Sequence, residues 1–270
     1  MRRLEIFRRS LIVFSCAVTL VLAVAICSLF FVPGWRDIMT SLTSEETLFS
    51  LGMSVLTGLV STLLVMLAAI PIAFSFSRFS FPGQRIVRVV LYLPIAFPEI
   101  VLGLCLLLFF GSSFIGQMLR AINLDIVFTK KGIVVAQFFT ALPYAVRVIK
   151  TAFDGIDPQL EYVSRSLGIS QLRTFFSVSL PLAKDGLKAA TAIAFARCVG
   201  AFGSVLILAG GTRLDTETLP ITLYLNISYG NIDMAITAGL LLVIVAFIGI
   251  YAIEMSERAQ EGKRRSGSRG

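Results

Sequence analysis

The chain has 270 residues, of which 56% are hydrophobic and only 15% charged, and its formal net charge is +8. Soluble domains carry about 25% charged residues and cannot bury this much apolar surface, so a soluble globular protein is excluded. There is no histidine. Because the commonest metal ligand and general base is missing, most hydrolase and redox schemes are removed, and no metal site is expected.

Six apolar stretches organise the chain. A helix that spans a bilayer needs about 20 apolar residues. The stretches that approach or exceed this length are Leu11–Val32, Leu48–Ser77, Val89–Phe110, Ile133–Val146 (which can extend to Ile149), Ala189–Gly211 and Met234–Ile253. The first is too long for a signal-peptide core and lacks a small-residue cleavage site, so we expect a retained helix. The predicted fold is all-α: a polytopic membrane protein with about six transmembrane helices.

Basic residues divide unevenly between the two sides that six spans define. Of the 24 Lys and Arg residues, 18 lie on the side of the two termini and five on the opposite side. The excess of basic residues marks the cytoplasmic side, so both termini are predicted to be cytoplasmic. Attraction to the anionic inner leaflet also accounts for the net charge, and no nucleic-acid partner is expected.

A polar segment, residues 154–181, separates the fourth and fifth stretches on the cytoplasmic side. Asp157 followed by Pro158 predicts a helix start, and Gly168 predicts the end of that helix after Leu167. Ser170 can cap a second helix over Gln171–Leu180. Two short helices joined by a turn are expected; by composition alone, an ordinary interfacial amphipathic loop is the alternative.

The order of residues in this segment resembles the EAA loop of permease subunits of bacterial and archaeal ABC importers. The matching positions are Glu161, Gly168, Val178, Leu180 and Pro181. Tyr162 and Val163 depart from the Glu-Ala-Ala with which the family loop usually begins. The resemblance implies a type I importer fold and a coupling helix that sits in a groove of the ATPase subunit. We predict that Gly168 forms the turn, while Glu161, Arg165 and Arg173 make polar contacts with the ATPase.

Two later segments are similar to the molybdate, tungstate and sulfate permeases. They are Ala196–Gly211, in the fifth stretch, and Thr216–Tyr224, in the external loop that follows. Ala201 stands where many relatives carry a glutamate. The resemblance implies import of a tetrahedral oxyanion, molybdate or tungstate rather than sulfate, across a prokaryotic plasma membrane. It also implies a second permease copy, a cytoplasmic ATPase dimer and an extracytoplasmic substrate-binding protein.

The energy source must lie in another chain. The sequence contains no Gly-x-x-x-x-Gly-Lys-Ser/Thr, so it cannot bind ATP in the P-loop manner. We therefore expect neither enzymatic activity nor a cofactor in this chain, with ATP bound and hydrolysed by the partner subunit.

Glu99 and Arg197 are the only charges deep within apolar stretches. Each costs roughly 2.5–3.5 kcal/mol if it faces lipid, so each should face protein or water. One interpretation is a structural ion pair between the third and fifth spans; the other has Arg197 lining a water-filled anion path. Gly200 and Gly203 form a small-residue face, suited to helix packing within the subunit or to a two-subunit interface at a pore.

The predicted organisation is one membrane domain with flanking segments. Residues 1–47 form a cytoplasmic start, the first helix and an external loop; residues 48–256 form the permease domain; residues 257–270 form a disordered basic tail. Two rival functions stay open. Pro98-Glu99-Ile-Val is also reminiscent of polyamine importers, in which Glu99 would be a ligand, and a membrane sensor or scaffold could use residues 154–181 to bind a signalling partner.

Overall fold

The computed structural model describes residues 2–28 and 35–267, and every regular element among them is helical, as predicted. In chain order the elements are α1 (Arg2–Ser28), α2 (Trp35–Leu42), α3 (Glu45–Arg78), α4 (Gln84–Ala96), α5 (Glu99–Ser112), α6 (Phe114–Ala121), α7 (Lys130–Asp154), α8 (Pro158–Ser166), α9 (Gln171–Thr174), the π-helical turn η1 (Phe175–Ser179), α10 (Leu180–Leu182), α11 (Lys184–Val199), α12 (Gly203–Ala209), α13 (Leu219–Ser228) and α14 (Ile232–Gly267).

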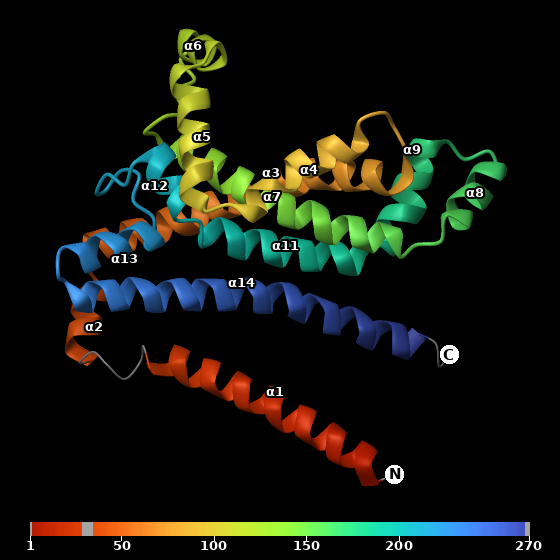
Figure 1. Cartoon of the computed structure of the whole chain (residues 1–270), viewed down its shortest axis with the longest axis horizontal. Coiled ribbons are helices and arrows are strands. Elements are labelled where there is room, and N and C mark those ends of the chain that lie inside the picture. The colour runs from red at the N-terminus through yellow and green to blue at the C-terminus, as the bar shows by residue number, and fades with distance from the viewer. Residues whose placement is uncertain (1, 29–34, 268–270) are drawn as a thin grey trace.

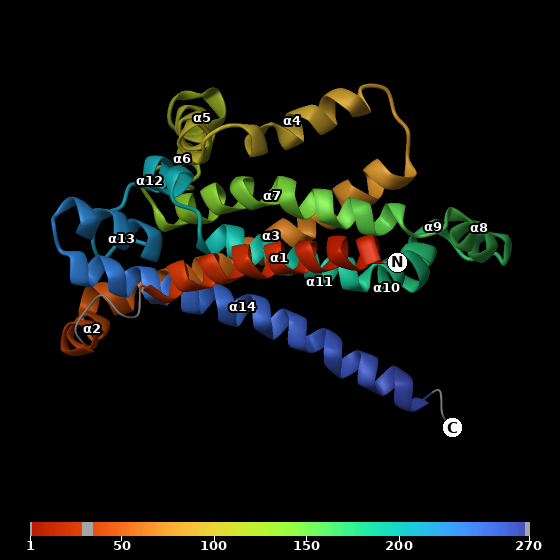
Figure 2. The same ribbon diagram turned by 60° about the horizontal axis from the view of Figure 1, so that its bottom comes forward.

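Long helices run side by side along the longest dimension of the molecule (Figure 1). The short helices α8 and α9 lie at one end of this bundle, and α2 and α13 lie at the other. Both termini point toward the α8–α9 end in the two views (Figures 1 and 2). The polar segment and the termini therefore share one end of the bundle, the arrangement that an even number of spans requires.

Four single helical stretches are long and apolar enough to cross a membrane: Arg9–Ser28, Glu45–Arg78, Lys130–Asp154 and Ile232–Tyr251. Two bent helix pairs raise the number to six if each pair is one span. The described helices thus agree with the prediction of about six spans when each bent pair is counted as one broken span. The end of the first predicted span, residues 29–32, lies outside the described residues.

The third predicted span is not one straight helix, because α4 and α5 meet at an angle of 120°. Phe97 between them adopts an extended backbone, with φ −120° and ψ 160°. A residue before proline is disfavoured in the helical region, and Pro98 cannot donate an N–H to continue α4. Pro71, in contrast, lies within an unbroken α3. As a result α5 leaves the bundle and projects away from α3 and α7 (Figure 1).

The fifth predicted span is also interrupted, by a bend of 55° between α11 and α12. Gly200 caps the end of α11, and α12 begins only at Gly203. The two halves of this span therefore present different faces to the rest of the molecule, and only α12 packs closely against α5.

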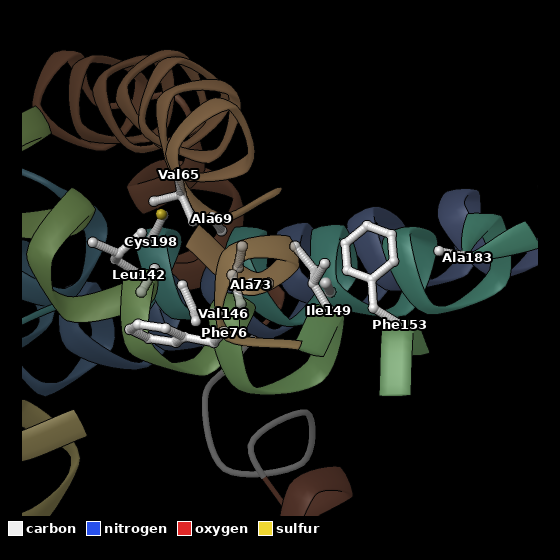
Figure 3. Close-up of a cluster of buried hydrophobic side chains, with 14 of the residues drawn as sticks. Val65, Ala69, Ala73, Phe76, Leu142, Val146, Ile149, Phe153, Ala183 and Cys198 are labelled. Carbon is white, nitrogen blue, oxygen red and sulfur yellow. The ribbon is translucent and has the colours of Figure 1, made fainter. Parts of the chain in front are cut away.

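Small apolar residues form the centre of the bundle, where α3, α7 and α11 meet. Ala69 and Ala73 on α3 and Ala145 on α7 are fully buried, beside Ile149 and Phe153 (Figure 3). Small residues let helix backbones approach closely, so the helices gain van der Waals contacts. These contacts matter in a bilayer, because the hydrophobic effect does not drive helices together there. By contrast, the rest of the described chain buries none of the apolar residues in the α1 segment Arg9–Ser28.

The basic tail differs from its prediction. Residues 257–270 were expected to be disordered, but α14 continues through Gly267. The run Glu257-Arg-Ala-Gln-Glu is rich in good helix formers, so a helix that leaves the apolar region has local reason to continue. Residues 268–270 lie outside the described part.

Candidate functional site

The first half of the polar segment folds as the local sequence dictates. The Asp157 side chain accepts a hydrogen bond from the Gln159 N–H at 2.9 Å, and Pro158 opens α8. Gly168 ends the helix with φ +82°, a conformation that costs other residues more. Helix start and turn are therefore both confirmed, and Gly168 lies exposed at the tip of the segment.

The second half corrects the predicted α-helix over Gln171–Leu180. Ser170 does cap a helix, by accepting from the Arg173 N–H, but α9 ends at Thr174 and the π-helical turn η1 follows. Leu180 N–H donates to the Phe175 carbonyl, five residues back. Because Pro181 has no N–H and its ring crowds the carbonyl four residues earlier, the turn before it widens.

An ion pair ties the polar segment to the end of α3. The Arg78 Nε lies 2.8 Å from Glu161 Oε1, and the same oxygen accepts from the Ser179 hydroxyl at 2.9 Å. Arg78 also donates to the Ile156 carbonyl at 3.0 Å. Both charged side chains are mostly buried. The Glu161 carboxylate is thus held within the chain rather than presented on the surface, which differs from its expected role as a direct ATPase contact.

Further contacts join the same elements. The Ser77 hydroxyl donates to Asp154 at 2.6 Å, and Lys150 pairs with the same carboxylate. Phe74 on α3 packs edge-on against Phe175, with ring centroids 4.7 Å apart. The segment is therefore anchored to α3 and to the end of α7 by polar and aromatic contacts together.

The segment also exposes large apolar side chains, which together are called its apolar face. Leu167 is 77% exposed, and the large apolar side chains that share this exposure are Leu160, Tyr162, Val163, Leu172 and Phe176. Arg165 and Arg173 are also exposed, and Pro181 is exposed while Val178 and Leu180 are half-buried. A hydrogen bond of 3.0 Å between the Ser164 and Thr174 hydroxyls joins α8 to α9 beneath this face.

Arg78 was missed by sequence reasoning. It stands 83 residues before Glu161 in the sequence, so no local spacing links the two. The available signal was a basic residue at the cytoplasmic end of the second span, which also fits simple attraction to the inner leaflet.

The two intramembrane charges do not pair with each other among the described residues. The Glu99 carboxylate accepts from the Phe202 N–H at 3.2 Å, at the beginning of α12. The Arg197 guanidinium lies 4.1 Å from the centre of the Tyr144 ring and is exposed. Of the two interpretations, the ion pair is therefore absent from this structure: a backbone donor contacts Glu99 and an aromatic ring contacts Arg197.

The two glycines of the small-residue face have different surroundings. A Cβ at Gly203 would lie 2.8 Å from the Ile100 side chain and 2.9 Å from its nitrogen, so Gly203 lets α5 and α12 touch. Gly103 on α5 makes the reciprocal approach to Ser204. Gly200 is exposed, beside Arg197 on α11.

Comparison with known proteins agrees with this architecture. Residues 65–260 match the family model for the binding-protein-dependent transport system inner membrane component. The chain belongs to this family. It is 35% identical over 219 residues, 81% of this chain and 79% of the relative, to a protein of Haloferax volcanii named "Probable molybdenum ABC transporter permease protein".

Two further similarities bear on relatives and fold. A protein of Prototheca wickerhamii named "Probable sulfate transport system permease protein cysT" is 26% identical over 86% of this chain and 92% of its own length. The crystal structure of a bacterial ABC transporter involved in import of the acidic polysaccharide alginate superposes with a TM-score of 0.72 at 15% identity. That match covers 96% of this chain and 99% of the other, and it shows the type I importer permease fold.

Proposed function

We propose that this chain is the membrane-spanning subunit of an ATP-driven importer of a tetrahedral oxyanion, molybdate or tungstate rather than sulfate. Membership of the permease family supports the transport role. The substrate is supported by an identity of 35% to a molybdenum permease, against 26% and 30% to two sulfate permeases. The observation that carries the mechanism is that the α8–α9 segment is anchored to α3 and α7 and also exposes large apolar side chains.

This apolar face is the ATPase docking surface. An exposed cluster that includes Leu167 and Leu172 is stabilised when a partner covers it. Exposed Arg165 and Arg173 supply the polar contacts around it. Gly168 sets the turn between the helices, and Glu161 acts indirectly by holding the segment in place.

Movement of the ATPase subunits reaches the membrane by two connections. The Arg78–Glu161 ion pair transmits displacement of the segment into α3, and Leu180 and Pro181 transmit it along the chain into α11. Because α3, α7 and α11 share one tightly packed core, they move together. Closure of the two ATPases would then switch the permease between inward-open and outward-open states.

Arg197 is assigned to the translocation path. It is exposed on α11, and a guanidinium facing lipid would cost roughly 2.5–3.5 kcal/mol. A water-filled path between two permease copies removes this cost and supplies a cation for an anionic substrate. Exposed Gly200, one turn away, leaves space beside it.

The assembly comprises two copies of this chain, a cytoplasmic ATPase dimer and an extracytoplasmic binding protein in a prokaryotic plasma membrane. The α8–α9 end and both termini face the cytoplasm, as the distribution of basic residues indicates.

Uptake by vesicles that contain the permease, its ATPase and its binding protein tests the function. We expect ATP-dependent uptake of molybdate and tungstate, less of sulfate and none of spermidine, with a non-hydrolysable ATP analogue as the control. A photo-crosslinking amino acid at position 167 should capture the ATPase, while one at position 229, at the opposite end, should not. Spermidine uptake would favour the polyamine alternative, and purification without any ATPase would favour a sensor.

A further inference from the structure

A polar pocket lies at the end of the bundle away from α8 and α9. It has a volume of about 300 Å³ and lies between the start of α3, the α12–α13 connection and the turn from α13 to α14. Its charged and polar side chains are Glu46, Arg213, Glu217, Asn226, Tyr229 and Asn231. We call it the acidic pocket, because two carboxylates face one guanidinium.

Glu46 is fully satisfied within the pocket. One of its oxygens accepts from the Asn226 amide at 2.9 Å, and the other lies 2.7 Å from an Arg213 nitrogen. The Glu46 side chain is 9% exposed, whereas that of Arg213 is 73% exposed. Arg213 therefore covers Glu46 from the solvent side of the pocket.

Glu217 is the opposite case. It is fully buried, and within the described part of the chain neither of its carboxylate oxygens has a donor at full hydrogen-bond distance and angle. The Thr222 hydroxyl and the Leu214 backbone lie near enough to lower the pKa of the carboxyl, without the geometry of a full hydrogen bond. The hydroxyl of nearby Thr222 donates to the Thr218 carbonyl instead, at 3.2 Å. A buried acceptor without a donor costs about 1–3 kcal/mol, and more if it is charged, so the site is incomplete as it stands.

The charges around Glu217 would attract a cation once its carboxyl is ionised. Burial raises the pKa of its carboxyl and the charge of neighbouring Glu46 adds to that rise, while weak hydrogen-bonding interactions with the Thr222 hydroxyl and the Leu214 backbone and the charge of Arg213 lower it. With both carboxylates ionised, the pocket keeps one uncompensated negative charge. A resident metal is disfavoured, since the described residues contain no group of three His, Cys, Asp or Glu side chains.

We propose that the acidic pocket receives a lysine or arginine side chain of the extracytoplasmic binding protein, which pairs with Glu217 when the two proteins dock. The proposal rests on the proposed function for its orientation and partner. Charge complementarity and the size of the pocket support it. Tyr229, 78% exposed, and Arg213 flank the entrance, where the incoming side chain would compete with Arg213 for the carboxylates.

Titration of the intact complex in lipid nanodiscs with purified binding protein tests this assignment. The measured quantity is the binding-protein concentration that half-maximally stimulates ATP hydrolysis. Glu217→Gln keeps the side-chain volume. We expect it to raise this half-maximal concentration roughly tenfold or more, with the maximal rate of ATP hydrolysis unchanged. Arg213→Gln should lower it, because the pocket becomes more negative. Glu45→Gln removes an exposed carboxylate beside the pocket and should leave it unchanged.

The outcomes separate this inference from the function on which it rests. Stimulation of the wild type, with identical titrations for Glu217→Gln and the wild type, overturns the docking site and leaves the transporter intact. Weaker docking of Arg213→Gln also overturns the docking site, which keeps the test decisive even if Glu217→Gln fails to assemble. Absence of any stimulation in the wild type contradicts the proposed function and the docking site together.

A final arm distinguishes a protein side chain from a free cation. Thermal stability is measured without binding protein in sodium chloride and in potassium chloride. Equal effects of each salt on the wild type and Glu217→Gln support a side chain that arrives with its protein. Stabilisation of the wild type alone assigns the pocket to a small cation and overturns the proposal.

Discussion

The two ends of the bundle each hold a mostly buried carboxylate, and they treat it in opposite ways. At the α8–α9 end, one oxygen of Glu161 accepts from Arg78 and from Ser179. At the other end, neither oxygen of Glu217 has a donor at full hydrogen-bond distance and angle among the described residues. A satisfied carboxylate fixes the position of a segment, while an unsatisfied one is free to bind something that arrives. We infer a mechanical role at the first end and recognition at the second.

Of the substitutions that test this contrast, removal of Arg78 should have the largest effect on stability and transport. Arg78→Ala leaves Glu161 mostly buried without its charged partner, and breaking such a pair costs about 3 kcal/mol or more. We expect lower thermal stability of the purified complex and loss of oxyanion uptake with ATP hydrolysis partly retained. Arg85→Ala, at an exposed position on α4, is the control and should change neither quantity. Full uptake in Arg78→Ala would contradict a transmitting role for the pair.

The contact between α5 and α12 lies between the two ends, and its disruption should have the next largest effect on stability. In Gly203→Ala the new Cβ would meet Ile100 at 2.8 Å, so the helices must separate at a cost of about 1–3 kcal/mol. Gly52→Ala is the matched control, since no described atom lies within 4 Å of its Cβ position. That control should be neutral or stabilising by up to about 1 kcal/mol. Thermal unfolding of both variants measures the difference, and equal stabilities would rule out a tight contact.

The same substitution at the two carboxylates should act in opposite directions. Glu161→Gln weakens charge-assisted hydrogen bonds and should cost about 1.5 kcal/mol. Glu217→Gln should be neutral or stabilising at neutral pH. Burial holds the pKa of Glu217 above its ordinary value of 4.5, so the unfolded chain ionises first as pH rises. The wild type therefore loses folding stability as the pH rises from about 4.5 to the higher pKa that Glu217 has in the folded state.

Thermal midpoints of wild type and Glu217→Gln, measured from pH 4 to pH 7.5, check this sign. The advantage of Glu217→Gln over the wild type should grow as pH rises. A constant difference would show that the carboxyl titrates normally. The two ends would then differ only in the hydrogen bonds that their carboxylates make.

The smallest effect is expected at the turn of the α8–α9 segment. Gly168→Ala must hold φ +82°, a strain of about 1 kcal/mol, and no described atom lies within 4 Å of the new Cβ. Gly168→Asn should cost less, because asparagine tolerates this conformation better. Lower coupling efficiency with normal membrane insertion is expected for Gly168→Ala, measured as oxyanions imported per ATP. Equal costs for the two variants would point away from backbone strain.

Features that depend on neighbouring residues could be predicted from the sequence. Asp157 and Ser170 cap helices and Gly168 forms a turn because each acts on backbone within a few residues. The apolar stretches likewise predicted the spans by length alone. The angle of 120° between α4 and α5, in contrast, depends on where α5 packs, which local sequence does not determine.

Features that join distant residues could not be predicted. The sequence left open whether Glu99 pairs with Arg197, and in the structure a backbone N–H of Phe202 donates to Glu99 instead. Backbone donors carry no sequence signal. For the same reason Arg78 could not be recognised as the partner of Glu161, and only the folded arrangement reveals that Glu217 lacks a donor.

The separation of α1 from the bundle has a practical consequence. The apolar residues of its segment Arg9–Ser28 are not buried by the rest of the described chain. Its neighbours in the bilayer are therefore lipids or other proteins. A fluorophore placed on its outer surface would report on that environment and would disturb the α3, α7 and α11 core little. Labelling α1 is therefore a way to follow where the assembly resides in a membrane while the moving parts stay unmodified.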